Sequence, residues 1–352
     1  MSSHYVYCVI PAAVQSPLDL QDKIPARERI GGEGINAICH EDIAAIVSPA
    51  QPLDLPKMRA EELAQTLLAH QKVIELVMES STLAIPFRLG TYAATEAEVV
   101  EIVAKGSRVI RRLFGEIDGK FEMDVAVTWA DFASVIKEAG EEDAIKGYKE
   151  SLCGDRGGVC VEERMKVGFM VKQALDRKSQ ETGRLIAKKL AAVSCAQRAH
   201  ENMDDQMVIN CAFMVEAARR VQFERTLDEL DAQFADKLKF RCVGPLAPYS
   251  FYTLELKRIQ WEDVDWARRL MSLDRIASPE KIEKAFRHSA MAMHPDRRGS
   301  AETGERTFDE LIRARSIVLE YVQACEQAES SAQIVFSEES VRQNSLLVKV
   351  AN

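Results

Sequence analysis

The chain has 352 residues, which is more than one ordinary hydrophobic core and predicts two or three domains. Its formal net charge of −9 argues against nucleic acid as a main partner, because phosphate binding needs a basic footprint. No run approaches the roughly 18 apolar residues of a membrane span, and Met1–Tyr5 lacks the basic start of a signal peptide. We therefore expect a cytoplasmic protein that does not enter the membrane.

The eight cysteines form no Cys-x-x-Cys pair, and several lie inside apolar runs. This usage predicts reduced thiols that pack as small hydrophobic side chains in a reducing compartment. The paired ligand spacing of a structural zinc site is missing, so we expect no metal and no other cofactor.

The first part of the chain alternates short strands with two helices. Strands are predicted at residues 5–10, 35–39, 43–48 and 83–88, and helices at residues 59–80 and from Thr95 to about Phe114. Pro86 marks an edge strand because it cannot donate to a ladder. Thr95 with Glu98 three positions later has the capping-box pattern of a helix start.

Residues 121–129 alternate between apolar and polar side chains, which predicts a half-buried strand. The apolar set is Phe121, Met123, Val125, Val127 and Trp129, and the opposite face carries Glu122, Asp124, Ala126 and Thr128. We assign this strand to an N-terminal domain of residues 1–130, whose order of elements favours a ferredoxin-like α+β fold.

The rest of the chain predicts a helical connector, a second α/β domain and a helical module. The connector covers residues 131–205, the second domain residues 206–260, the module residues 264–326 and a C-terminal tail residues 327–352. The fold class is therefore α+β, with two ferredoxin-like α/β domains linked by long helices and followed by a small all-helical module. The tail is predicted either to dock as short strands or to form a flexible end.

Five motifs in order along residues 4–258 resemble the gas vesicle protein F/L family. They are Tyr5-Val6-Tyr7, His70 with Val73 and Glu75, Ile85–Thr91, Gly119–Glu122 and Gly244-Pro245-Leu246-Ala247-Pro248-Tyr249-Ser250-Phe251. Three positions depart from the family pattern: Met123 stands where Trp is usual, Ala126 where Lys is common, and Ala247 where Pro is usual.

The resemblance implies a non-enzymatic protein that binds the small hydrophobic shell protein, and other gas vesicle proteins, during vesicle assembly. Such a partner is physically reasonable, because shell subunits that face gas expose apolar surface before assembly. The residues that it implies for structure or shell-protein binding are Tyr5, Tyr7, Pro86, Arg88, Gly90, Gly244, Pro245, Pro248, Tyr249 and Phe251. Each also has a plain structural interpretation: an ion pair for Arg88, a turn for Gly90, and core packing for Tyr249 and Phe251.

Residues 264–326 resemble a J domain, the module that engages DnaK-type chaperone ATPases. Ser278-Pro279 opens the second helix, and His294-Pro295-Asp296 follows it directly. The resemblance implies that His294 and Asp296 contact the ATPase, that Pro295 is a rigid spacer, and that Lys284 and Arg287 belong to a basic docking patch. Ala292 stands where J domains usually have Lys, so the alternative is a helical hairpin kept for packing.

Two other functions compete with a gas vesicle assembly factor. An enzyme is disfavoured because the six histidines are scattered and no nucleophile elbow, zinc-protease or Walker motif occurs. A general J-domain co-chaperone unrelated to gas vesicles is the second alternative. The motifs at Pro86–Thr91 and Gly244–Phe251 favour the gas vesicle protein, because a general client binder does not need them.

Overall fold

The computed structural model describes residues 3–13, 25, 29–32, 34–80, 83–152, 160–293, 308–328 and 333–351. The chain divides into two compact units. Unit 1 combines Met1–Glu116 with Tyr252–Asn352, and unit 2 is Ile117–Phe251, so the chain passes between the units twice. Among the described helices, none is long and apolar enough to cross a membrane.

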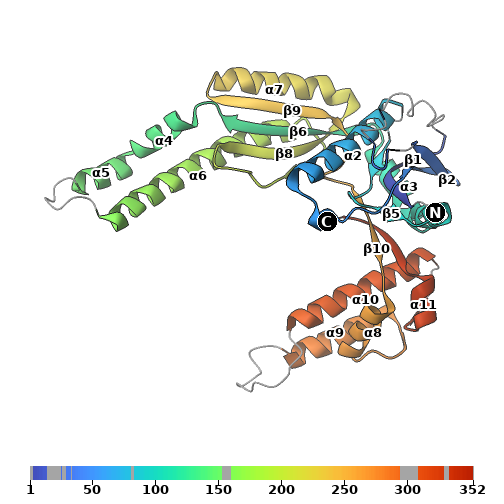
Figure 1. Ribbon diagram of the computed structural model, residues 1–352. Coiled ribbons are helices and arrows are strands. Elements are labelled where there is room, and N and C mark those ends of the chain that lie inside the picture. The colour runs from blue at the N-terminus through green and yellow to red at the C-terminus, as the bar shows by residue number, and fades with distance from the viewer. Residues whose placement is uncertain are drawn as a thin grey trace. The chain divides into compact units, whose positions relative to one another are not determined.

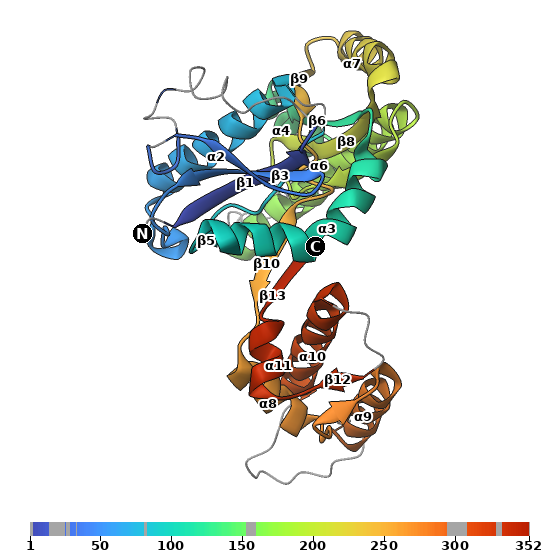
Figure 2. The same cartoon turned by 90° about the vertical axis from the view of Figure 1, so that its right-hand side faces the viewer.

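The N-terminal part of unit 1 is an antiparallel sheet in the order β2-β3-β1-β4, with β5 also paired to β1 (Figure 2). The elements are β1 (His4–Pro11), β2 (Asn36–His40), β3 (Ile43–Pro49), η2 (Leu55–Lys57), α2 (Ala60–Ser80), β4 (Ile85–Pro86), β5 (Tyr92–Ala93) and α3 (Glu96–Ile117). Residues 4–10 of β1 are buried throughout, and β1 is a central strand, with β3 on one edge and β4 and β5 on the other. The predicted helix start is confirmed: Thr95 Oγ1 accepts from the Glu98 N–H at 3.1 Å.

Unit 2 follows the order β-α-β-β-α-β, with an antiparallel sheet in the order β7-β8-β6-β9 (Figure 1). This is the ferredoxin-like arrangement. The elements are β6 (Lys120–Trp129), α4 (Phe132–Gly140), α5 (Asp143–Leu152), α6 (Val161–Ala191), β7 (Ala196–Ala199), β8 (Met207–Glu216), η3 (Ala217–Arg219), α7 (Arg220–Phe234) and β9 (Leu238–Leu246).

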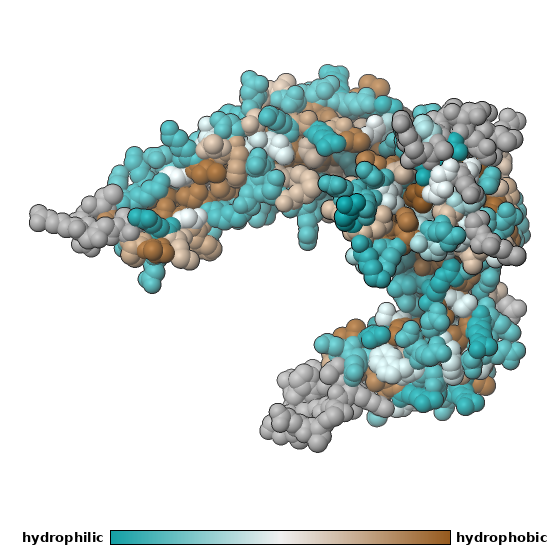
Figure 3. All heavy atoms as spheres, viewed as in Figure 1, coloured by the Kyte–Doolittle hydropathy of each residue, from teal (hydrophilic) through white to brown (hydrophobic). Residues whose placement is uncertain are grey.

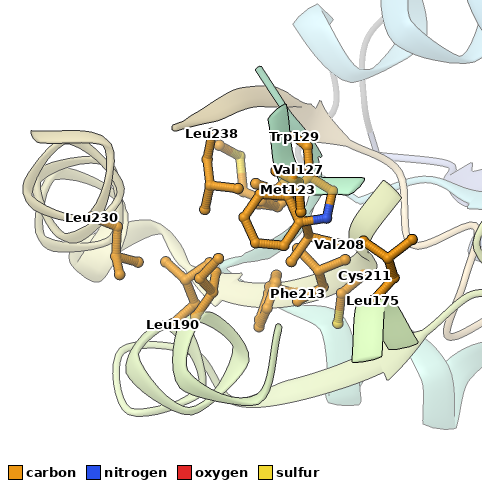
Figure 4. Close-up of a cluster of buried hydrophobic side chains, with 14 of the residues drawn as sticks. Met123, Val127, Trp129, Leu175, Leu190, Val208, Cys211, Phe213, Leu230 and Leu238 are labelled. Carbon is orange, nitrogen blue, oxygen red and sulfur yellow. The ribbon is translucent and has the colours of Figure 1, made fainter. Parts of the chain in front are cut away.

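The core of unit 2 lies between one face of this sheet and helices α6 and α7 (Figure 4). Met123, Val127 and Trp129 of β6 point into it, as the alternating pattern predicts, and meet Leu190 of α6 and Leu230 of α7. Burying these side chains is the main favourable contribution to the stability of unit 2, at about 25 cal/mol per Å² of apolar surface removed from water.

The predicted domain assignment of residues 121–129 is wrong, because β6 pairs with β8 and β9 of unit 2. In the N-terminal sheet the two edges of β1 are taken by β3 on one side and by β4 and β5 on the other. The strand order of the N-terminal sheet, β2-β3-β1-β4 with a direct β2–β3 hairpin, is the same ferredoxin-like order that unit 2 has, counted from the first strand of each. The predicted bounds are therefore wrong: residues 1–130 are not one domain, and the second α/β domain begins at β6 rather than at residue 206.

The C-terminal part of unit 1 packs three helices around a common core, as predicted. Its elements are β10 (Leu254–Arg258), α8 (Trp261–Leu270), β11 (Ile276–Ala277), α9 (Pro279–Met293), α10 (Phe308–Ala328), β12 (Ile334–Val335), α11 (Glu338–Gln343) and β13 (Leu346–Val350). The module is not all-helical, because β11 pairs with β12 and β10 pairs with β13. Between a flexible end and short docking strands, the two alternatives predicted for the tail, the structure shows docking strands: β12 pairs with β11 and β13 pairs with β10.

The strand pair β10–β13 joins this module to the N-terminal part of the same unit. The Arg88 N–H donates to the Leu254 carbonyl at 2.7 Å, and Arg258 donates to Glu98 and to the Tyr92 carbonyl. On the β13 side, Val348 packs so closely on Gly106 of α3 that a Cβ at this glycine would lie 3.0 Å from the Val348 side chain. Both the outgoing and the returning strand of the module are thus held by the sheet-forming part of unit 1.

Two glycines of α6 provide a matched test of the unit 2 packing. A Cβ at Gly183 would lie 2.8 Å from the Val208 carbonyl oxygen, whereas a Cβ at Gly168 meets nothing within 4 Å. We expect Gly183→Ala to lower the free energy of unfolding by about 1–3 kcal/mol, because α6 must move away from β8. Gly168→Ala should raise it by about 0.5–1 kcal/mol, as alanine is the better helix former. Guanidinium unfolding of both variants checks this, and equal effects would contradict the close packing.

Candidate functional site

The motif residues of unit 1 form a buried tyrosine–histidine cluster of Tyr5, Tyr7, Ser48 and His70. Tyr5 Oη lies 2.7 Å from His70 Nδ1, and the Tyr7 ring stacks on the His70 ring with centroids 5.8 Å apart. Tyr7 Oη lies 3.0 Å from Ser48 Oγ. Both tyrosines are completely buried and His70 is 2% exposed. The cluster therefore satisfies polar groups inside the core and offers none of them to a partner at the surface.

Burial controls the charge of this cluster. Desolvation lowers the pKa of His70 to about 4, although its hydrogen bond to the Phe87 backbone opposes the shift. Desolvation also raises the pKa of Tyr5 and of Tyr7 above the usual tyrosine value. At neutral pH the cluster is therefore uncharged.

The loop after β4 carries the other motif residues of unit 1. Pro86 is buried, whereas Arg88 is exposed and its Nη1 donates to Glu255 Oε1 at 2.9 Å. Gly90 has φ +84°, the conformation predicted for it, and a Cβ there would also lie 2.6 Å from the Leu55 side chain. The loop lines an open pocket of about 590 Å³ in which Arg88 and Arg258 are each paired with a glutamate.

In unit 2 the motif residues Glu122 and Ser250 form a second group together with Asp124 and His200, the carboxylate cluster. Glu122 Oε2 accepts from the Ser250 N–H at 2.8 Å, and Glu122 Oε1 accepts from Ser250 Oγ at 2.7 Å. His200 Nε2 lies 3.1 Å from the same hydroxyl oxygen. The structure thus joins two motifs that are far apart in the sequence, Gly119–Glu122 and Gly244–Phe251.

The second motif runs close to β6 at Gly244. The β6–β9 register shifts between Glu122 and Asp124, and Gly244 lies at this irregularity with φ +150°. A Cβ at Gly244 would lie 2.5 Å from Met123 Sδ and 2.8 Å from the Glu122 carbonyl oxygen. Pro245 is exposed, Pro248 is buried, and Tyr249 and Phe251 are half-buried, so the core role predicted for the two aromatic residues is only partial.

Both carboxyl groups of this cluster are harder to ionise than usual. Desolvation raises the pKa of Glu122 and the neighbouring Asp124 charge raises it further, while the Ser250 hydrogen bonds act against the shift. Desolvation also raises the pKa of Asp124, against the influence of Glu122 and His200.

The cluster contains a serine, a histidine and acids, but not in the arrangement of a nucleophile triad. A triad needs its carboxylate on the imidazole nitrogen that faces away from the serine. Here the carboxylate of Glu122 binds the serine itself, and none of the hydrogen bonds among the described residues joins a carboxylate to His200. Within the described ranges no group of His, Cys, Asp and Glu is arranged to hold a metal.

The predicted chaperone-contact residues fall in two places. Lys284 and Arg287 are exposed on α9, where Arg287 Nε lies 3.8 Å from Glu283 Oε1. His294, Pro295 and Asp296 lie outside the described residues. Their role in ATPase contact stays a prediction.

The family model described as gas vesicle synthesis protein GvpL/GvpF matches residues 3–253. The chain belongs to this family. Its matched residues contain the tyrosine–histidine cluster and the carboxylate cluster in full, whereas the module from β10 onward lies outside the match.

The chain is similar to gas vesicle protein F of Microcystis aeruginosa, with 22% identity over 252 residues that cover 71% of this chain and 98% of the relative. The crystal structure of GvpF from Microcystis aeruginosa superposes with a TM-score of 0.57 at 22% identity, over 71% of this chain and 99% of that chain. The crystal structure of GvpF from Anabaena sp. PCC7120 gives the same TM-score at 18% identity, over 71% of this chain and 98% of that chain. These structures support the α+β fold of the family region.

The sequence pattern did not predict the carboxylate cluster. Alternation placed Glu122 and Asp124 on the polar face of a half-buried strand, yet Glu122 is only 1% exposed. The chain at Leu246–Ser250 folds back over this face of β6 and supplies its hydrogen-bond donors. The sequence did contain both partners, because one motif ends in Glu122 and the other includes Ser250. Their spacing in the sequence could not show that the two side chains are in contact.

His70 should make unit 1 sensitive to acid. Its folded pKa of about 4 lies below the unfolded value, so the stability contributed by neutral His70 is complete above pH 6.5 and falls as pH drops toward 4. The loss is roughly 3 kcal/mol over this range. His70→Gln, which stays neutral, should flatten the dependence in urea unfolding at pH 7, 6 and 5. The exposed His288→Gln is the control and should keep the wild-type slope; a wild-type slope in His70→Gln would refute this role.

Proposed function

We propose that this protein is a gas vesicle assembly factor that binds the small hydrophobic shell protein and assists formation of the shell without catalysis. The observation that carries the proposal is the match of residues 3–253 to the gas vesicle synthesis family, with both motif clusters inside it. Association with gas vesicles and contacts with other gas vesicle proteins are part of the same proposal.

An apolar shell subunit needs an exposed apolar surface on its partner, and α6 carries exposed apolar residues. Val161, Met165 and Phe169 follow each other at helical spacing with exposed fractions of 72%, 69% and 62%. Figure 3 shows apolar side chains exposed among the helices α4–α6 of unit 2. Contiguous exposed apolar residues of this kind are typical of protein-binding surfaces. We therefore direct the binding test at this α6 stripe.

Met165→Ser with Phe169→Ser should weaken binding of the shell protein at least about tenfold, because two apolar anchors are lost from the contact. Val221→Ser is the control: Val221 is 76% exposed on α7 and should leave binding unchanged. Pull-down followed by titration with purified shell protein measures both. If wild type does not bind, the proposed function fails. If the double variant binds like wild type, the contact is not on the α6 stripe.

We also propose that the C-terminal module recruits a DnaK-type chaperone to the shell-protein complex. Its support is the resemblance to a J domain together with one exposed face of α9, which carries Lys281, Lys284, Arg287 and His288. A basic face on a chain of net charge −9 suits an acidic partner such as the chaperone ATPase. Bringing the chaperone and the shell subunit onto one protein raises their effective concentration.

His294→Gln should abolish stimulation of the chaperone ATPase while shell-protein binding stays at the wild-type level. Lys284→Ala with Arg287→Ala should reduce stimulation several-fold, and Arg342→Ala, an exposed arginine of α11, should not. A steady-state assay of the chaperone's ATP hydrolysis rate, with each variant added in turn, measures this stimulation. A wild type that binds shell protein without stimulating the ATPase would make the module a packing hairpin. Stimulation without any shell-protein binding would favour the general co-chaperone.

A further inference from the structure

The two faces of the unit 2 sheet are covered differently. Helices α4, α5, α6 and α7 pack their buried apolar residues against the face that carries Met123 and Val127 (Figure 4). The opposite face carries the alternate side chains of each strand. The returning segment Leu246–Ser250 lies over one end of that face, above Glu122.

Away from the covered end, this face has small or uncharged side chains at its centre and cations at its β9 edge. Ala126 of β6 lies between Asn210 on β8 and Arg241 on β9, and Thr128 lies beside Lys239. Paired residues of antiparallel strands point to the same side, so these five side chains share one surface, which we call the open face. Ala126, Thr128 and Asn210 are half-buried, whereas Lys239 and Arg241 are exposed.

The cations of the open face have no acidic partner in the parts of the chain that the structure describes. Neither Lys239 nor Arg241 forms an ion pair there, and neither does Arg198 on the far edge strand β7. By contrast, Arg220 and Arg225 on α7 each bind a glutamate. Unpaired cations on a chain of net charge −9 suit an acidic partner.

Three acids point to the same side of the sheet, but they lie toward its covered end. Glu122 is buried under the returning segment, and Asp124 is half-buried. Glu216 binds Arg219 at 3.2 Å. Lys120 lies directly opposite Glu216. The surface next to β9 is therefore positively charged.

The turn between β7 and β8 carries further acids, beyond the opposite edge of the sheet. Asp205 binds Lys172 of α6 at 2.8 Å, and Asp204 accepts from the Gln206 N–H at 2.9 Å. Glu201 of the same turn is exposed. An acidic partner should therefore place its carboxylates on the β9 side of the open face and not on the β7 side.

We propose that the open face docks an acidic amphipathic helix of a partner protein. The apolar side of this helix packs on Ala126 and Thr128, and a row of its carboxylates meets Lys239 and Arg241. The site is separate from the α6 stripe, because α6 packs on the other face of the sheet. It is therefore independent of whether the protein binds the shell protein or a chaperone.

The dimensions of the sheet suit a helix. Four strands about 4.8 Å apart place the outer strands about 14 Å from each other, and a helix with its side chains is about 10–12 Å wide. Lys239 and Arg241 are two residues apart on one strand, which separates them by about 7 Å. Carboxylates three or four residues apart on one side of a helix are spaced by about 5–6 Å, so two of them can meet the two cations.

Two other occupants suit these residues less well. An added strand would pair along β9, but Lys239 and Pro245 are of the kinds of residue that protect a sheet edge from pairing. Single-stranded nucleic acid stacks its bases on aromatic side chains of an open sheet. The centre of this face offers Ala126, Thr128 and Asn210 instead.

A designed peptide tests the open face in the full-length chain. The probe is a labelled helical peptide of about 20 residues with an alanine–leucine stripe flanked by glutamates, and its control has lysine in place of every glutamate. Fluorescence anisotropy should show saturable micromolar binding of the glutamate peptide and none of the lysine peptide. Raising the salt from about 50 to 300 mM should weaken binding several-fold, because the contacts between exposed charges are screened.

Variants locate the contact. Lys239→Ala with Arg241→Ala should weaken binding at least about fivefold, because two charge contacts are lost. Lys188→Ala with Arg225→Ala removes two exposed cations from the helices of the other face and should leave binding unchanged. Ala126→Leu keeps the charge but raises the centre of the face, so it should also weaken binding.

Three results would overturn the proposal: no binding of the glutamate peptide by wild type, equal binding of both peptides, or equal losses in the two double variants. A single-stranded RNA oligonucleotide is tested in parallel. If it bound more tightly than the peptide and lost affinity in Lys239→Ala with Arg241→Ala, the face would belong to nucleic acid and the helix would be excluded. Thermal unfolding of each variant checks its fold, and the charge variants decide the outcome if Ala126→Leu does not fold.

Discussion

The structure depends on the pairing of β6 with β8 on one edge and β9 on the other. Both edges of this strand are satisfied inside unit 2, and its apolar face supplies Met123, Val125, Val127 and Trp129 to the core. A central strand cannot also serve another sheet, because each edge has only one set of backbone donors and acceptors. Because β6 belongs to unit 2, the chain passes from unit 1 to unit 2 at Glu116–Ile117, just before β6. The N-terminal sheet is built without β6, with β1 as a central strand.

The same pairing buries the Glu122 carboxyl group, and the second motif supplies the hydrogen-bond donors for it. A central strand with one apolar face turns Glu122 to the other side, and there the chain after β9 covers it. A buried carboxyl group without partners would cost several kcal/mol. Gly244 allows the close approach to β6, and Ser250 supplies two donors to one carboxyl group. Gly244 and Ser250 of the second motif are therefore both explained by their contacts with Glu122.

Local patterns in the sequence predicted most helices and strands but not their partners. Apolar spacing and caps gave α2, α3 and β6, because these signals depend on neighbours a few residues apart. Alternation defines the two faces of a strand, yet it carries no information on which distant strand will pair with it. The domain of β6, the burial of Glu122 and the pairing of β13 with β10 all depend on contacts between remote segments, and these were missed or left open. The family motifs did not reveal that two of them are in contact through Glu122 and Ser250.

The C-terminal module shows how such remote pairing changes a functional argument. A J-like module on a flexible tether would search a large volume, and its effective concentration would depend on linker length. Here the strands that enter and leave the module pair with each other, Arg258 binds Glu98, and Lys105 Nζ donates to the Gln343 carbonyl at 2.9 Å. The module that carries the basic face of α9 is therefore fixed to the rest of unit 1 through both of its ends. A chaperone bound there would be held by a module anchored through both of its ends, so its local concentration would not depend on the length of a flexible linker.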